Sequence, residues 1–153
     1  MEHHYAVALE WTGNTGEGTK RYSGYQRSHN IIIANKPVIE CSSDPAFRGD
    51  PSRHNPEEML VASLSSCHML WFLHLCSENG IIVLKYSDHA NGTMLEDKEG
   101  GRFTKVILHP HVTISDPSKI DLANSLHEQA NKKCFVANSC NFPVHHQPIC
   151  IAG

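Results

Sequence analysis

The sequence lacks the excess of positive charge that binding to nucleic acid or to an anionic membrane surface would require. Its 153 residues include 13 lysines and arginines against 16 aspartates and glutamates, for a formal net charge of -3. The two signs are interspersed along the chain and form no basic stretch. Partners of these two kinds are therefore not expected.

Several further signals are missing. The N-terminal segment MEHHYAVALEW has no basic part followed by an apolar part. We therefore expect no secretory signal and a cytoplasmic location. There is no internal repeat and no low-complexity segment. The 12 histidines and six cysteines show no CxxC, HxxxH or HExxH spacing, so neither a zinc site nor another cofactor is expected.

The six cysteines would form three disulfides in a small secreted protein. This chain has no secretory signal and is long enough to bury a core, so free thiols are the expected resting state. Cys67 and Cys76 cannot pair within one straight helix, because nine residues of rise separate them by about 13 Å. Any disulfide must therefore join different elements.

One stretch, from Asn55 to Gly80, is expected to organise the rest of the chain as a long buried helix. Asn55 is a suitable N-cap, Pro56 suits the first helical position, and Gly80 can adopt the left-handed conformation that ends a helix. The residues between are apolar on nearly every side, so the helix should be covered all round. A membrane span is the alternative, but serines and histidines interrupt the run and no basic flank follows it.

The remaining elements predict an α+β fold in a single domain, residues 1–153. Three antiparallel strands are expected before the helix, near residues 5–11, 21–33 and 38–42, followed by a loop at 44–54. After the helix, residues 81–94 and 102–114 should form a hairpin joined by LEDKEGG. A second helix should begin at residues 116–117 and end near residue 134, and the chain should finish in a short edge strand.

Two cysteines are candidates for chemistry, although a cysteine at either position, taken alone, is more often structural than reactive. Cys67 lies within the long helix, where it gains little from the helix dipole, so activation would need a cation from another segment. Cys134 lies at the end of the second helix, where the negative end of the dipole should raise its pKa, partly offset by Lys132 and Lys133. If the two thiols cooperate, Cys67 is the better nucleophile and Cys134 the better resolving thiol.

The segment NPEEMLVASLSSCH, followed by a hairpin and then by LHEQANKKCFVANS, resembles the OsmC/Ohr family of osmotically inducible and organic hydroperoxide resistance proteins. The likeness extends from Trp11 to the end of the chain and is greater to the OsmC-like branch. It implies an intertwined homodimer with the cysteine helices at its centre, and thiol-dependent reduction of organic hydroperoxides. A dithiol, such as that of a lipoyl protein, would restore the thiols.

The resemblance also implies roles for four residues. Cys67 would be the peroxidatic cysteine, Cys134 the resolving cysteine, and Glu57 the glutamate of the NPE motif. Arg27 would supply the guanidinium that favours the thiolate, held by a bidentate pair with Glu57. Cys140 could compete with Cys134, Arg48 or Arg53 could replace Arg27, and Phe135 stands where many relatives have proline.

Alternatives of other classes stay open at this point. Twelve histidines and six cysteines could form a metal-storing or metal-sensing set, and an apolar cleft could bind a hydrophobic small molecule with the cysteines idle. His68 and His74, six residues apart on the long helix, are expected to be satisfied core histidines. Trp11, Phe47 and Trp71 are expected to favour bulky organic hydroperoxides over hydrogen peroxide.

Overall fold

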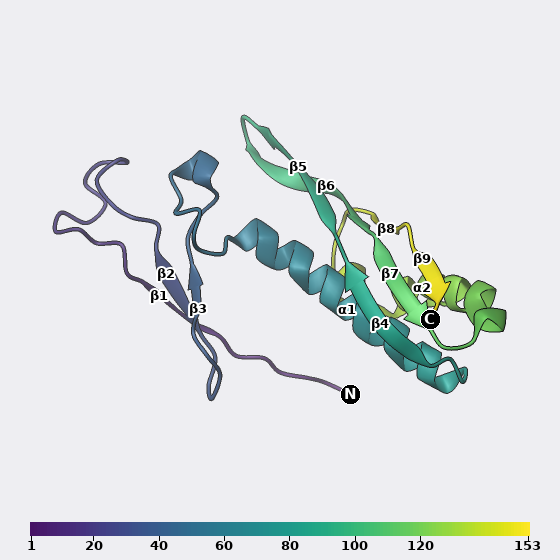
Figure 1. The fold of residues 1–153 in the computed structure, drawn as a ribbon. Helices are drawn as coiled ribbons and strands as arrows, with labels where there is room; N and C mark the ends of the chain where they lie inside the picture. Colours follow the sequence, from purple (N-terminus) through teal and green to yellow (C-terminus); the bar gives the residue numbers. More distant parts are fainter. The chain divides into compact units, whose positions relative to one another are not determined.

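A computed structural model describes all of residues 1–153 (Figure 1). The chain forms two compact units, Met1–Leu60 and Val61–Gly153, which are described separately below. The mixed helix and strand content confirms the predicted α+β class. That all 153 residues act as one domain stays a prediction.

The first unit contains the predicted three-stranded antiparallel sheet, in the order β1-β2-β3. Its strands are β1 (Ala8–Trp11), β2 (His29–Ile32) and β3 (Ile39–Cys41). The second strand is much shorter than the 13 residues expected, because the chain before it turns: the Gly24 amide donates to the Arg21 carbonyl at 2.9 Å. A short 3-10 turn, η1 (Pro45–Phe47), lies within the predicted loop.

Helix α1 (Pro56–Glu78) has the predicted ends. The Asn55 side chain accepts from the Glu58 amide at 2.8 Å, which satisfies one of the free N–H groups of the first turn. At the other end Gly80 has φ 65°, and the Ile81 amide donates back to the Cys76 carbonyl at 2.9 Å. This is the closing pattern for which glycine is favoured.

The second unit builds two three-stranded sheets, β4-β7-β9 and β5-β6-β8. The strands are β4 (Val83–Asp88), β5 (Asn91–Asp97), β6 (Gly100–Leu108), β7 (Pro110–Ile114), β8 (Val144–His146) and β9 (Ile149–Ala152). Each run predicted for the hairpin bends once and contributes one strand to each sheet. The hairpin is confirmed, and the chain ends in an edge strand as expected, preceded by the unpredicted β8.

Two helices follow β7. A 3-10 turn, η2 (Pro117–Lys119), leads into α2 (Ile120–Lys133), which matches the predicted second helix, and a four-residue helix, α3 (Phe135–Asn138), comes directly after Cys134. Buried side chains from α1, α2 and the sheet β4-β7-β9 form the core of this unit. The residues of that core are Phe72, Leu75, Cys76, Ile81, Val112, Ile114, Ala123, Leu126 and Ala130.

Helix α1 is not covered all round in the single chain, contrary to the sequence-based expectation. Its buried residues form one stripe, whereas Leu70 is 60% exposed. By length and composition α1 could cross a membrane, and 28% of its most apolar window is buried in the chain. The polar interruptions still favour a globular helix, and an apolar face left open suits the expected dimer, which stays a prediction.

Candidate active site

The second unit brings Cys67 and Cys134 together, although 67 residues of sequence separate them. Cys67 projects from the middle of α1 and is partly buried, while Cys134 is 1% exposed at the junction of α2 and α3. Their side chains are near enough for the Cys67 thiol to raise the pKa of Cys134, and both cysteines are free thiols. The pair is therefore placed where a disulfide could join two different elements.

Cys134 is held as a thiol rather than a thiolate. Burial, followed by the hydrogen bond with Cys67, raises the pKa of Cys134 to about 11. The Ala137 amide donates to the Cys134 sulfur at 3.4 Å and opposes this rise. The direction is the one predicted from the sequence, but burial rather than the helix dipole is its largest cause.

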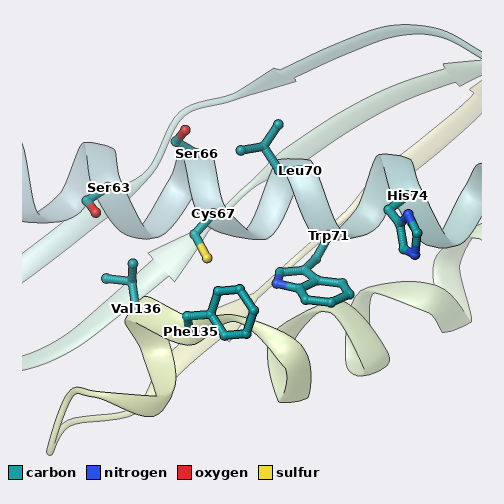
Figure 2. A pocket seen from close by; sticks show the side chains of 8 residues that line it. All are labelled: Ser63, Ser66, Cys67, Leu70, Trp71, His74, Phe135 and Val136. Carbon is teal, nitrogen blue, oxygen red and sulfur yellow. The ribbon is translucent and has the colours of Figure 1, made fainter. Parts of the chain in front are cut away.

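An apolar pocket of about 470 Å³ opens over the Cys67 thiol. Figure 2 shows Cys67 and Trp71 pointing from α1 toward Phe135 and Val136 of α3. The Trp71 and Phe135 rings meet edge to face, with centroids 5.5 Å apart, which is a favoured aromatic geometry. The full lining is Ser63, Ser66, Cys67, Leu70, Trp71, His74, Phe135 and Val136.

One of the three aromatic residues expected near Cys67 lines the pocket. Trp71 forms part of its wall as expected, whereas Trp11 and Phe47 belong to the first unit. The contribution of Phe135 was missed, because α3 is too short to leave a periodic pattern. A large apolar residue directly after a candidate resolving cysteine was the one available signal.

Arg27 lies in the first unit, just before β2. Its guanidinium donates to the Tyr25 and Tyr22 carbonyls, at 2.6 Å each, and lies 3.9 Å from the Tyr25 ring centroid and 4.5 Å from that of Tyr22. These contacts fix a planar cation in one orientation. Within the chain Arg27 forms no ion pair with Glu57, so the predicted bidentate pair is not present there.

Glu57 lies in the first turn of α1, as the sequence indicated. Its Oε2 atom is buried and has no hydrogen-bond partner. A buried carboxylate oxygen without a donor is costly, and such atoms call for a specific explanation. Glu57 therefore has an unused acceptor that a cation could satisfy.

The alternative arginines differ in their surroundings. Arg53 is largely buried and lies 3.8 Å from Glu40 and 4.0 Å from Asp50, so its charge is already balanced. Arg48 is exposed, has φ 63°, and lies 5.9 Å from the Tyr22 ring centroid. Neither is held by its neighbours as tightly as Arg27.

A cluster of buried histidines lies beside the thiol pair. His68 Nε2 and His127 Nδ1 are 2.9 Å apart, and the His146 ring lies 5.7 Å and 6.0 Å from theirs. Burial, followed by neighbouring imidazoles, lowers the pKa of His68 to about 4 and that of His127 to about 3. Burial also lowers the pKa of His146. All three are held neutral at pH 7.

The other histidine expected in the core is not there. His74 is exposed, lines the mouth of the pocket, and lies 3.2 Å from Glu78 one turn further along α1. The expectation was correct for His68 only, because the exposed face of α1 is uncovered in this chain. No group of three or more His, Cys, Asp or Glu side chains has the geometry to hold a metal ion.

Cys140 does not share the site of the first pair. Its thiol donates to the Val136 carbonyl at 3.3 Å, and burial raises its pKa. Cys67 influences the pKa of Cys134 but not that of Cys140. Competition by Cys140 would therefore require a rearrangement of the chain after α3.

Residues 49–147 match the family of OsmC-like proteins. A solved OsmC-like protein of unknown function from Vibrio cholerae is 30% identical, with a TM-score of 0.86 over 97% of this chain and 100% of that one. A solved organic hydroperoxide resistance protein from Legionella pneumophila shares the fold at 16% identity, with a TM-score of 0.69 over 97% of this chain and 98% of that one.

A curated relative supports the same grouping. The uncharacterised protein YmaD of Bacillus subtilis is 23% identical over 141 residues, which is 90% of this chain and 87% of that protein. The match over residues 49–147 covers the long helix and both Cys67 and Cys134. The chain belongs to the family of OsmC-like proteins, some of whose structural relatives are described as organic hydroperoxide resistance proteins.

Proposed function

We propose that this protein is a thiol peroxidase that reduces organic hydroperoxides to alcohols. The observation that carries the proposal is that the Cys67 thiol lines an apolar pocket and has the Cys134 thiol as its neighbour. Two thiols within bonding reach can store the two electrons that one peroxide bond requires. The hydroperoxide resistance relatives, which share the fold, support the same assignment.

The reaction begins at Cys67. Its thiolate sulfur attacks the terminal peroxide oxygen, the O–O bond breaks, and the leaving alkoxide takes a proton to become the alcohol. Cys67 is left as a sulfenic acid. The Cys134 sulfur then attacks that of Cys67, the S–O bond breaks, and water leaves as the disulfide forms. An external dithiol, such as a lipoyl group, returns both thiols by exchange.

Cys134 suits the second step rather than the first. A thiol with a pKa of about 11 is almost wholly protonated at neutral pH and is a poor nucleophile toward free peroxide. Once Cys67 is a sulfenic acid, however, its neighbour reacts within the molecule, where proximity compensates for weak nucleophilicity. The asymmetry of the pair therefore supports these two roles.

A cation beside Cys67 completes the proposal. The residues that line the pocket include no lysine or arginine, so the charge that favours the thiolate must come from another segment. We assign it to Arg27, whose guanidinium is already oriented by two tyrosines, with the unpaired oxygen of Glu57 as its acceptor. A homodimer, which the family resemblance implies, would offer these residues from either chain.

The apolar wall of the pocket supports the substrate class. Leu70, Trp71, Phe135 and Val136 can receive a hydrocarbon group, while hydrogen peroxide gains nothing from them. We therefore expect kcat/KM for an arylalkyl hydroperoxide to exceed that for hydrogen peroxide. Comparable values for both substrates would refute this preference.

The decisive experiment is peptide mapping after one equivalent of an alkyl hydroperoxide. The expected product is a disulfide between Cys67 and Cys134, with one alcohol released per protein. Cys67→Ser should abolish peroxide consumption, Cys134→Ser should accumulate sulfenic acid, and Cys140→Ser should behave as the natural protein. Thiols that stay reduced and unreactive would support the second candidate, a binding protein for a hydrophobic small molecule, which the apolar pocket also fits.

A further inference from the structure

The buried histidines join the two helices that bring the thiols together. His68 on α1 and His127 on α2 are both at most 1% exposed and share the 2.9 Å contact between Nε2 and Nδ1. Among the hydrogen bonds made by side chains, this one alone joins α1 to α2. Phe72 stacks on the His127 ring with centroids 4.0 Å apart, which keeps water from the contact.

The position of this hydrogen bond relative to the sulfurs is what matters. His68 directly follows Cys67 in the chain, and His127 precedes Cys134 by seven residues, about two helical turns. Residues seven apart lie on the same face of a helix. A slip between α1 and α2 at the histidine pair would therefore move one sulfur away from the other.

The hydrogen bond needs a particular protonation state. Between two neutral imidazoles, one nitrogen donates its proton and the other accepts it. One added proton can occupy the free nitrogen of the donor ring and leave the bond intact, but protonation of both rings would place two N–H groups face to face in a dry site, and the bond would be lost. His68 Nδ1 and His127 Nε2, the remaining nitrogens, are buried without hydrogen-bond partners.

We propose that the His68–His127 pair positions Cys67 against Cys134, so that their disulfide is disfavoured relative to the dithiol when the pair is removed or when both of its rings are protonated. This proposal rests on the function proposed above because it concerns the same two thiols, but it does not require that they reduce peroxide. The histidines act through the helices and do not touch the reacting atoms, so both are positioning residues.

Charged and titratable groups face the pair from three elements. On β4, Asp88 favours the protonated form of His68, and it is held by Ser65 at 2.5 Å and by the His109 amide at 2.6 Å. From β8, His146 opposes protonation of both rings, and Glu128 of α2 lies 4.0 Å from His146. Asp88 favours an added proton on His68, whereas His146 opposes one on either ring. The pair is therefore protonated only in acid.

The test measures disulfide closure without any peroxide. The protein is equilibrated with reduced and oxidised glutathione, and acid-quenched samples are resolved by mass into dithiol, mixed disulfide and internal disulfide. In this exchange a Cys67 thiolate displaces one glutathione and Cys134 displaces the other, so the equilibrium reports how well the two sulfurs are placed.

Four variants separate positioning from packing. His68→Leu and His127→Leu keep side-chain volume but remove the hydrogen bond, and each should disfavour the internal disulfide about tenfold, with mixed disulfide accumulating. The double variant His68→Gln, His127→Asn retains amide nitrogens and oxygens near the same positions but does not titrate, so it should restore closure. His111→Gln, at an exposed histidine on β7, is the matched control and should not change it.

The pH dependence provides the second measurement. The ratio of closure in the natural protein to closure in the double variant should fall as the pH is lowered toward 4, because only the natural protein can be protonated at this contact. The thiols' own titration cancels in the ratio, and tryptophan fluorescence at each pH separates loss of the histidine contact from loss of the fold. Leucine variants that close like the natural protein, or a ratio that does not vary with pH, would overturn the proposal. Should the leucine variants fail to fold, the pH ratio decides alone.

The outcome is separable from that of the proposed function. Closure that depends on the histidines in a protein that consumes no peroxide would leave the positioning role standing and remove the peroxidase. Peroxide consumption in a protein whose disulfide closure does not depend on the histidines would support the peroxidase and remove the positioning role.

Discussion

Acid should destabilise this protein through His68 and His127 to an extent that the structure allows us to work out. Both imidazoles are buried and neutral in the folded chain, with pKa values of about 4 and about 3 against 6.5 for an ordinary histidine. Above pH 6.5 neither state binds the proton. Below it the unfolded chain does and the folded chain does not, so stability falls as pH falls.

The size of the effect follows from the width of that window. Each pH unit between the unfolded and folded pKa values costs about 1.36 kcal/mol per histidine. Between pH 6.5 and about pH 4.5 the two histidines should therefore lose roughly 5 kcal/mol together. That is comparable with the whole stability of many domains, about 5–15 kcal/mol.

The assay is urea unfolding, followed by tryptophan fluorescence at one protein concentration and at several pH values. The double variant His68→Gln, His127→Asn keeps every carboxylate but loses both titrating rings, so it should lose roughly 5 kcal/mol less than the natural protein between pH 7 and 4.5. Equal losses in the two proteins, within about 1 kcal/mol, would refute the reasoning, since the pair could not then be neutral and dry in the fold.

Two further perturbations test other parts of the structure. Oxidation of Cys67 and Cys134 to a disulfide closes a loop of 67 residues (134 minus 67). In the chain-entropy description the oxidised protein should therefore be more stable than the dithiol by about 4 kcal/mol. The measurement is the shift of the urea midpoint on oxidation, which Cys134→Ser should abolish. Asn55→Ala removes the side-chain acceptor of the Glu58 amide and should cost about 1 kcal/mol of unfolding free energy, whereas Asn55→Ser should cost little; equal losses in both variants would show that the cap contributes nothing.

Local chemistry made much of the fold predictable. Asn55 and Gly80 fixed both ends of α1, since a cap acts through residues no more than a few positions away. The hairpin was predicted because its two runs are adjacent in the chain. The bends of the hairpin were not predicted. Nor was the parallel pairing of β8 with β6 and of β9 with β7, because such pairings depend on contacts with distant segments.

The expectation that failed for α1 shows the limit of composition. A helix apolar on nearly every side was expected to be buried all round, yet Leu70 is exposed in the single chain. Composition indicates that an apolar helix surface should be buried, but it does not indicate whether the same chain or another chain buries it. The placing of His74 in the core failed for the same reason.

What the sequence alone determined is the order of the elements, the limits of the long helix and the identity of two cysteines worth testing. Tertiary structure alone decided that Cys67 meets Cys134, that Phe135 lines the pocket, and that His68 meets His127 across 59 residues. Caps and strand patterns are set by neighbours in the chain, whereas burial, pKa shifts and thiol contact arise only when distant segments exclude water together.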